Sequence, residues 1–135
     1  MPIDQPDIEV VKAVFAAFAK RDLDGVLACA ADDIVFSSVT AEYSGRNEAY
    51  VGHDGIREYF RDVSSQWDEL RVTPTDFHQV GETILVTGKV TARSHARVIF
   101  GSTGWIWRVR AGKIIYGRVY PSAGDAIAAM ENSGA

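Results

Sequence analysis

Trp105 and Trp107 give the clearest chemical signal in this sequence, because they stand two residues apart in a segment that alternates like a β-strand. Successive side chains of a strand point to opposite faces, so both indole rings project from one face. The turns of the neighbouring hairpins direct that face toward the inside of the sheet. Two interpretations follow: the rings pack in a core, or they form an aromatic wall for a flat or terpenoid-like organic molecule.

Three histidines are candidates for acid–base or metal chemistry. His53, His78 and His95 lie far apart, and no second histidine or cysteine stands two to four positions from any of them. We therefore expect no metal, since zinc sites usually pair ligands locally. His53 opens a predicted helix, where it is either a general acid–base at a pocket mouth or a helix cap. The other two are expected to be surface imidazoles.

Asp76 is the candidate interior carboxylate. It lies on a predicted strand, where it could pair with Arg93 or Arg118. Hydrolysis through an activated water requires such an acid inside the protein, whereas a structural ion pair or solvent exposure is the simpler interpretation. The sequence has no nucleophile elbow, phosphate-binding loop or dinucleotide fingerprint, so we expect no cofactor.

The segment A-A-D-D-I-V-F-S-S places two adjacent acids before a short strand. Asp32 and Asp33 are predicted to form a turn, because aspartate bonds nearby backbone amides there. Phe36 and Ser38 share one face of the predicted strand 34–39. Ser38, at the strand's end, is either a ligand contact or a plain polar terminus.

Apolar periodicity predicts the elements that must position these residues. The predicted helices cover residues 6–20, 23–30, 53–67 and 122–130, and the predicted strands cover 34–39, 70–80, 83–94, 97–109 and 113–120. Asp22 is expected to cap the second helix. An irregular loop from Thr40 to Gly52 carries Tyr43 and Tyr50, and such loops often rim a site.

The composition of the chain limits which partners and which cellular location we expect. Its 135 residues fit a single domain, with a core from about 7 to 130, and 47% of them are apolar. The net charge of −4 comes from scattered acids and bases, so we expect no nucleic-acid partner. No targeting or membrane-spanning segment is evident, so no membrane contact is expected. Cys29 is the only cysteine, and a cytoplasmic location is the default.

Three helices followed by a run of antiparallel strands predict an α+β fold, with helices packed on one face of a strongly curved sheet. Tight turns join the later strands, which are therefore expected to be antiparallel. If side chains do not fill the concave side of such a sheet, it forms an apolar pocket.

The order of elements and three motifs resemble the nuclear transport factor 2-like superfamily, in particular its SnoaL-like branch. The motifs are D-L-D-G-V-L-A-C-A-A-D-D-I-V-F, G-H-D-G-I-R-E-Y-F and G-W-I-W-R-V-R-A-G-K-I-I, and the resemblance spans about residues 7–130. It implies a cone-shaped, cystatin-like roll with a ligand pocket between helices and sheet. It also implies a homodimer formed through the outer face of the sheet. The superfamily includes isomerases, cyclases, epoxide hydrolases, dehydratases and non-enzymes, so the resemblance does not assign an activity.

Ketosteroid isomerase is the sharpest comparison within this superfamily. The positions of its general base, its two oxyanion-hole groups and its two further tyrosines are occupied here by Ser38, Val14, Trp105, Ala30 and Phe60. A serine hydroxyl has no useful basicity near neutral pH, and the donors for an enolate are missing. We therefore exclude ketosteroid isomerisation.

Three hypotheses remain, and the sequence leaves open whether the protein is an enzyme. The first is a small-molecule-binding SnoaL-like protein with an apolar aromatic pocket. The second is a cyclase, epoxide hydrolase or dehydratase that uses His53 or Asp76. The third is a non-catalytic dimeric accessory domain whose interior is filled with side chains. The predicted ligand-binding residues are Val14, Phe18, Phe36, Ser38, Tyr50, Phe60, Trp105 and Trp107.

Overall fold

The helices and strands follow the order that the apolar periodicity predicts. The computed structural model describes residues 6–38 and 49–133. The helices are α1 (Pro6–Ala19), α2 (Leu23–Cys29), α4 (Gly52–Gln66) and α5 (Ala123–Ser133). The strands are β1 (Ala30–Ser37), β2 (Tyr50–Val51), β3 (Glu69–Val80), β4 (Thr83–Ser94), β5 (Arg97–Arg110) and β6 (Lys113–Tyr120). The four predicted helices and the four later strands are confirmed, with small differences at their ends.

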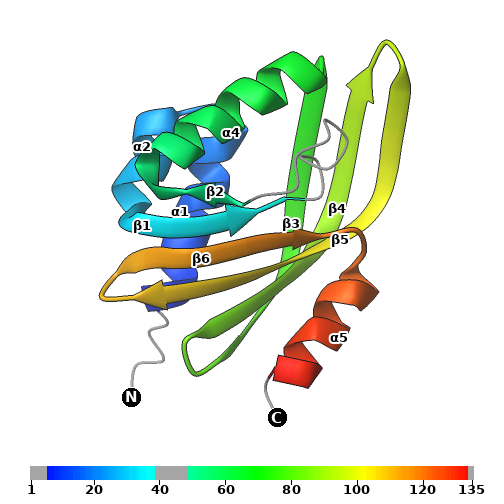
Figure 1. The fold of residues 1–135 in the computed structure, drawn as a ribbon. Coiled ribbons are helices and arrows are strands. Elements are labelled where there is room, and N and C mark those ends of the chain that lie inside the picture. The colour runs from blue at the N-terminus through cyan, green and yellow to red at the C-terminus, as the bar shows by residue number, and fades with distance from the viewer. Residues whose placement is uncertain (1–5, 39–48, 134–135) are drawn as a thin grey trace.

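The six strands that the structure describes form one sheet in the order β2-β1-β6-β5-β4-β3. Strands β1 and β6 are parallel, and the other neighbouring pairs are antiparallel. Figure 1 shows the sheet curving around α1, α2 and α4, with α5 apart from these three helices. The predicted α+β class, with three N-terminal helices on a curved and mainly antiparallel sheet, is therefore confirmed.

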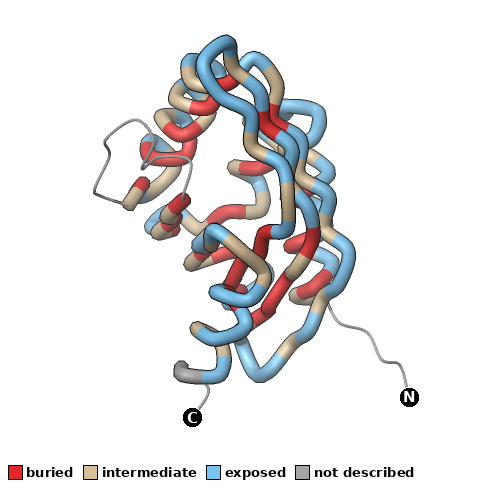
Figure 2. The backbone as a smooth tube through the Cα atoms, turned by 90° about the vertical axis from the view of Figure 1, so that its right-hand side faces the viewer, coloured by how far each residue is buried: buried red, intermediate tan, exposed pale blue. Residues whose placement is uncertain are grey.

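Side-chain alternation along β5 gives the sheet two buried faces. Trp105 and Trp107 belong to the main core with α1 and α4, whereas Ile106 belongs to a separate cluster with Leu85 of β4 and Ala126 of α5. Neighbouring residues of a strand point in opposite directions, so α5 packs on the outer face of the sheet. Figure 2 shows most buried positions in the interior, between the sheet and the helix layer.

Helices α1 and α4 each bury one apolar stripe against the sheet. In α1 the stripe includes Val11 and Phe15, and in α4 it includes Ile56, Tyr59 and Val63, all buried. The spacing of three and four residues places these side chains on one side of each helix. Among the described residues, no helix combines the length and the apolar character needed to cross a membrane.

Local signals fix where α2 begins and where the β5–β6 hairpin turns. The carboxylate of Asp22 accepts a hydrogen bond from the Gly25 backbone N–H at 3.1 Å, which confirms the predicted N-cap. In the turn between β5 and β6, Ala111 and Gly112 have φ angles of 53° and 78°. Two left-handed residues in succession are the conformation that a tight hairpin connection requires.

The prediction of a turn at Asp32 and Asp33 is wrong. Both residues lie inside β1, which begins at Ala30 rather than at Ile34, and both side chains are exposed. Helix α2 leads directly into the strand, because its C-cap Ala30 is already extended, with φ −104° and ψ 137°. No turn residues are needed at this junction. The ladder with β6 shifts register between Ala30 and Val35, so the two acids occupy an irregular stretch of the strand.

The predicted loop from Thr40 to Gly52 falls only partly within the described residues. Tyr43 lies outside them. Tyr50 is not in a loop but in the short strand β2, which pairs with β1 through Tyr50 and Phe36. Helix α4 follows at once, beginning at Gly52.

Candidate functional site

An apolar cavity of about 130 Å³ lies between the three N-terminal helices and the inner face of the sheet. Every described element except β2 and α5 contributes to its lining. At about 30 Å³ per water molecule, the cavity has room for roughly four waters, so side chains do not fill the interior completely. The lining residues with aromatic rings are Phe15, Phe18, Phe36, Tyr59, Phe60, Trp105, Trp107 and Tyr120.

Aromatic contacts hold the two indole rings in place. The ring centroid of Phe15 lies 4.9 Å from that of Trp105 and 5.7 Å from that of Trp107, edge-on in both cases. Phe36 stacks against Trp107 at 5.9 Å and meets Tyr59 edge-on at 4.8 Å. Offset-stacked and edge-to-face pairs each contribute about 0.5–1.5 kcal/mol beyond the area that they bury. Rings from α1, β1, α4 and β5 therefore form one connected wall.

Gly117 of β6 allows Trp107 to lie flat against the sheet. A Cβ atom at this glycine would stand 2.6 Å from Cζ3 and 2.7 Å from Cε3 of the indole, closer than carbon atoms can approach. The sequence therefore needs a residue without a side chain opposite Trp107, and the two residues are register partners across β5 and β6.

The polar groups of the lining are few and neutral. The Thr103 hydroxyl donates a hydrogen bond to the backbone oxygen of Tyr120 at 3.0 Å. Burial, with a further contribution from Tyr116, raises the pKa of the Tyr120 hydroxyl above its usual value of about 10, so this group stays protonated at neutral pH. The indole N–H of Trp107 is buried and has no hydrogen-bond acceptor within the described part of the protein.

None of the lining residues, all of them in the described ranges, has a carboxylate, an amine, a guanidinium or an imidazole. A buried ion without a partner is costly, so this lining disfavours a charged ligand. Arg21 stands just outside, where its guanidinium donates to the backbone oxygens of Phe18 at 2.5 Å and Leu70 at 2.6 Å. Burial lowers the pKa of Arg21. These bonds tie the C-terminus of α1 to β3 beside two lining residues.

The structure brings together seven of the predicted ligand-binding residues. Those that line the cavity are Val14, Phe18, Phe36, Ser38, Phe60, Trp105 and Trp107. Tyr50 is not among the lining residues. It is fully buried, and its hydroxyl donates to the carboxylate of Asp62 at 2.7 Å, which joins β2 to α4.

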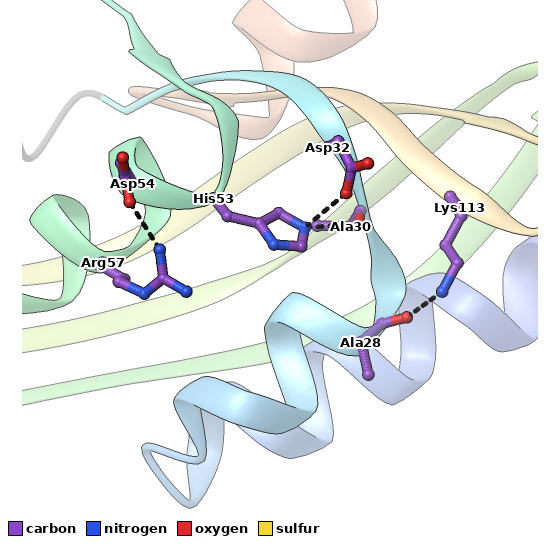
Figure 3. A network of polar contacts seen from close by, with 7 residues as sticks. All are labelled: Ala28, Ala30, Asp32, His53, Asp54, Arg57 and Lys113. Atoms are coloured by element: carbon purple, nitrogen blue, oxygen red, sulfur yellow. Dashed lines mark hydrogen bonds and ion pairs between the residues drawn. The ribbon is translucent and has the colours of Figure 1, made fainter.

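His53 lies at the start of α4 and is not part of the cavity lining. Its Nε2 atom is 3.0 Å from the backbone oxygen of Ala30 and 3.9 Å from a carboxylate oxygen of Asp32 (Figure 3). A carbonyl oxygen can only accept, so Nε2 is the donor in the first contact. The geometry therefore gives His53 a hydrogen bond that joins α4 to β1.

Asp76, His78 and His95 are exposed and also lie outside the lining. The carboxylate of Asp76 accepts a hydrogen bond from the neighbouring Thr75 hydroxyl at 3.2 Å. Arg93, one of its predicted partners, instead lies 3.5 Å from the carboxylate of Glu69. The surface positions predicted for the two histidines are confirmed.

Several lining residues were missed by the sequence reasoning, although their periodicity offered a signal. Tyr59 shares the apolar side of α4 with Ile56, three residues earlier. Thr103 and Ile99 have the same parity on β5 as the two tryptophans and face the same way. The lining residues of β3 and β4 had no comparable signal in the sequence, because alternation along these strands does not show which face points toward the helices.

The five positions compared with ketosteroid isomerase all line the cavity: Ser38, Val14, Trp105, Ala30 and Phe60. These five residues therefore all surround the same interior space. Among the described residues, no aspartate or glutamate lines the cavity. Nor do the described residues contain a cluster of three potential metal ligands.

The family model for the SnoaL-like domain matches residues 11–117 of the chain. No curated protein is significantly similar in sequence. Among solved structures, an NTF2-like protein of unknown function from Burkholderia pseudomallei has a TM-score of 0.80 and 25% identity, covering 93% of this chain and 97% of that one.

Two other solved structures contain bound organic molecules. TerC, co-crystallised with polyporic acid, has a TM-score of 0.79 at 23% identity, covering 94% of this chain and 99% of that one. A hypothetical protein with a ketosteroid isomerase-like fold from Catenulispora acidiphila, in complex with trimethylamine, has a TM-score of 0.72 at 16% identity. That comparison covers 89% of this chain and 90% of the other. Both likenesses concern the fold alone.

Proposed function

The chain belongs to the SnoaL-like domain family, and from that premise we propose that it binds a small apolar organic molecule in the cavity between its helices and its sheet. The observation that carries this proposal is the cavity itself, which has a volume of about 130 Å³, a largely apolar wall with eight aromatic side chains, and no charged lining residue among those described. Apolar surroundings with a few polar groups are typical of small-molecule sites.

Two features favour binding over the alternative of a filled accessory domain. An interior that served only stability would gain from closer packing, since voids forfeit dispersion contacts. At about 130 Å³, the cavity is close in size to an engineered apolar cavity of about 150 Å³ that binds benzene. Complexes of similar folds with polyporic acid and with trimethylamine also support an organic ligand for this one.

The enzymatic alternative requires a proton-transfer group near the ligand. His53 and Asp76, its candidate catalysts, lie outside the cavity lining. The described lining offers hydroxyl and indole groups, which bind and orient a molecule but do not act as bases near neutral pH. We therefore propose a binding protein without an assigned reaction.

A substitution that occupies the cavity tests this proposal. Val72 lines the cavity from β3, and Val80, on the same strand, is 66% exposed. The panel contains monocyclic aromatic, terpenoid and steroid compounds, and binding is followed by tryptophan fluorescence and by calorimetry. We expect at least one compound to bind, Val72→Phe to weaken its affinity by about tenfold or more, and Val80→Phe to leave it unchanged.

Circular dichroism and thermal unfolding would establish that both variants are folded before the affinities are compared. The absence of a response from every class of compound would contradict the proposal. Equal loss of affinity in Val72→Phe and Val80→Phe would also contradict the proposal, because only residue 72 lines the cavity.

The assembly and location proposed for the chain are a homodimer in the cytoplasm. Exposed apolar residues on the outer face of β5 support the dimer: Val98 is 71% exposed and Phe100 is 83% exposed. Large apolar side chains in such positions often mark a protein interface. Cys29, which has no second cysteine to pair with, supports a reducing compartment.

A further inference from the structure

We infer that Arg21 is a positioning residue of the binding site, whose guanidinium holds the ring of Phe18 and the strand β3 at Leu70 in the geometry in which both line the cavity. This inference rests on the proposed function, since it assigns a residue that prepares the site for its ligand. Three observations carry it: the backbone conformation of Arg21, the bonds of its guanidinium, and the rings that Phe18 contacts.

Arg21 occupies a backbone position where glycine is the usual residue. Helix α1 ends in a Schellman motif, in which the Arg21 backbone N–H donates to the Phe18 oxygen at 2.9 Å and the Asp22 backbone N–H donates to the Ala17 oxygen at 2.8 Å. The first of these donors adopts the left-handed conformation, and Arg21 has a φ of 53°. An arginine is strained there because of its Cβ atom, so the position costs stability that a glycine would not cost.

The guanidinium of Arg21 joins two elements that line the cavity. Its Nη1 atom donates to the backbone oxygen of Phe18 at 2.5 Å, and its Nη2 atom donates to that of Leu70 on β3 at 2.6 Å. Phe18 and Leu70 are both lining residues. A guanidinium is planar and rigid, so two of its nitrogen atoms donate from fixed positions. Arg21 therefore fixes how α1 and β3 lie relative to each other at this side of the cavity.

The same guanidinium also contacts the ring of Phe18. Its Cζ atom lies 4.2 Å from the ring centroid, within the range of a cation–π interaction. The Phe18 ring in turn stacks on Tyr59 at 6.0 Å and meets Phe60 edge-on at 5.6 Å. Both of these residues of α4 line the cavity. Arg21 is not itself among the lining residues, so it acts on the site through Phe18 and β3.

The end of helix α1 does not require these contacts. A glycine at residue 21 would form the same two backbone bonds without strain, and the bond to Leu70 and the contact with the Phe18 ring are not part of the motif. What these contacts add is order in the wall of the cavity. A side chain that becomes ordered only when a ligand binds reduces the affinity, so a ring that is already held in place favours binding.

Two substitutions at residue 21 separate positioning from stability. Arg21→Gly and Arg21→Ala both remove the guanidinium, but only glycine accepts the left-handed φ without strain. Arg21→Gly should therefore unfold at a higher temperature than Arg21→Ala, whereas a positioning role predicts the same loss of affinity in both. Lys20→Gly is the matched control, because it removes the neighbouring exposed cation from the same end of the helix.

Toluene, camphor and progesterone are the probes, one from each class of the apolar panel, and calorimetry and tryptophan fluorescence measure their binding. We expect Arg21→Gly and Arg21→Ala to weaken the affinity of the tightest probe by about two- to tenfold, the range expected when one more side chain must be ordered on binding. Lys20→Gly should retain the affinity of the unmodified protein. Circular dichroism gives the melting temperature of each variant, and the affinities are compared at a temperature at which all of them are folded.

A second measurement follows the Phe18 ring without a ligand. In protein labelled with ¹³C at its six phenylalanines, the ring signals of Phe18 should shift or broaden in Arg21→Gly. Phe100, which is 83% exposed on the outer face of the sheet, is the internal reference, and its signals should not change. Unchanged Phe18 signals would overturn the inference.

The outcomes distinguish a failure of this inference from a failure of the proposed function. If no probe of the panel binds to the unmodified protein, the proposed function fails and the inference fails with it. If a probe binds and Arg21→Gly keeps its full affinity, Arg21 is not a positioning residue while the binding function stands. A loss of affinity confined to the less stable Arg21→Ala would show that Arg21 serves stability alone. An equal loss in Lys20→Gly would also overturn the assignment, because any change at the end of α1 would then disturb the site.

Discussion

At the scale of single residues, the position of Trp107 depends on Gly117. The indole edge occupies the space where a Cβ atom of residue 117 would stand, at 2.6–2.7 Å from two ring carbons. We predict that Gly117→Ala lowers the free energy of unfolding by about 1–3 kcal/mol, because the ring or the backbone must shift to accept the methyl group. Urea denaturation followed by circular dichroism measures this loss.

Gly124→Ala is the matched control for that experiment. A methyl group at Gly124, on α5, would have only the Ser122 hydroxyl oxygen near it, at 3.7 Å. Alanine is favoured over glycine in a helix, so this variant should be as stable as the unmodified protein or more stable by up to about 1 kcal/mol. Unchanged stability in Gly117→Ala would show that Trp107 is not packed against β6 as described.

For the candidate site, the sequence predicted the positions of some residues and not of others. The spacing of Trp105 and Trp107 placed both rings on one face, and both are lining residues. Alternation could not show that Tyr50 is buried rather than at the rim of the site. The burial of Tyr50 depends on the pairing of β2 with β1 and on a hydrogen bond to Asp62 of α4. Contacts between segments distant in sequence leave no local pattern.

At the scale of elements, the outer face of β5 is divided between α5 and solvent. Ala126 of α5 packs over Gly104, where an added Cβ would lie 2.5 Å from the alanine methyl. Farther along the strand, Val98 and Phe100 stay exposed. We predict that Phe100→Lys converts a dimer of the 14.8 kDa chain into a monomer, because a buried ammonium opposes association.

Light scattering coupled to gel filtration measures that change in mass. Val80→Lys, at the other end of the sheet, introduces the same charge at another exposed valine and should leave the dimer intact. A monomeric unmodified protein, or a dimer that survives Phe100→Lys, would contradict the proposed interface.

Most elements were predictable because each repeats one signal many times. The apolar stripe of α4 recurs over its 15 residues, and β4 and β5 are runs of 12 and 14 residues rich in β-branched and aromatic side chains. The junction at Asp32 and Asp33 had a single local signal, the turn preference of aspartate, and it was overridden by the direct passage from α2 into β1. Strand β2 was too short to show any periodicity.

At the scale of the whole molecule, the fold explains why a cavity persists at its centre. The sheet curves, and α1, α2 and α4 lie across its inner face (Figure 1). Aromatic rings of different elements contact one another in the space between them. Sequence patterns predicted this arrangement through the order of the elements. The volume of the cavity was not predictable, because it depends on how side chains from eight elements fit together.

A crystal structure of the protein with a compound of the apolar panel that binds in solution tests the central claim most directly. We predict density for the ligand inside the cavity, between Phe15, Tyr59 and Trp105. A cavity that stays empty at a concentration saturating in solution, with the ligand on the outer face of the sheet instead, would contradict the claim that the interior is the binding site.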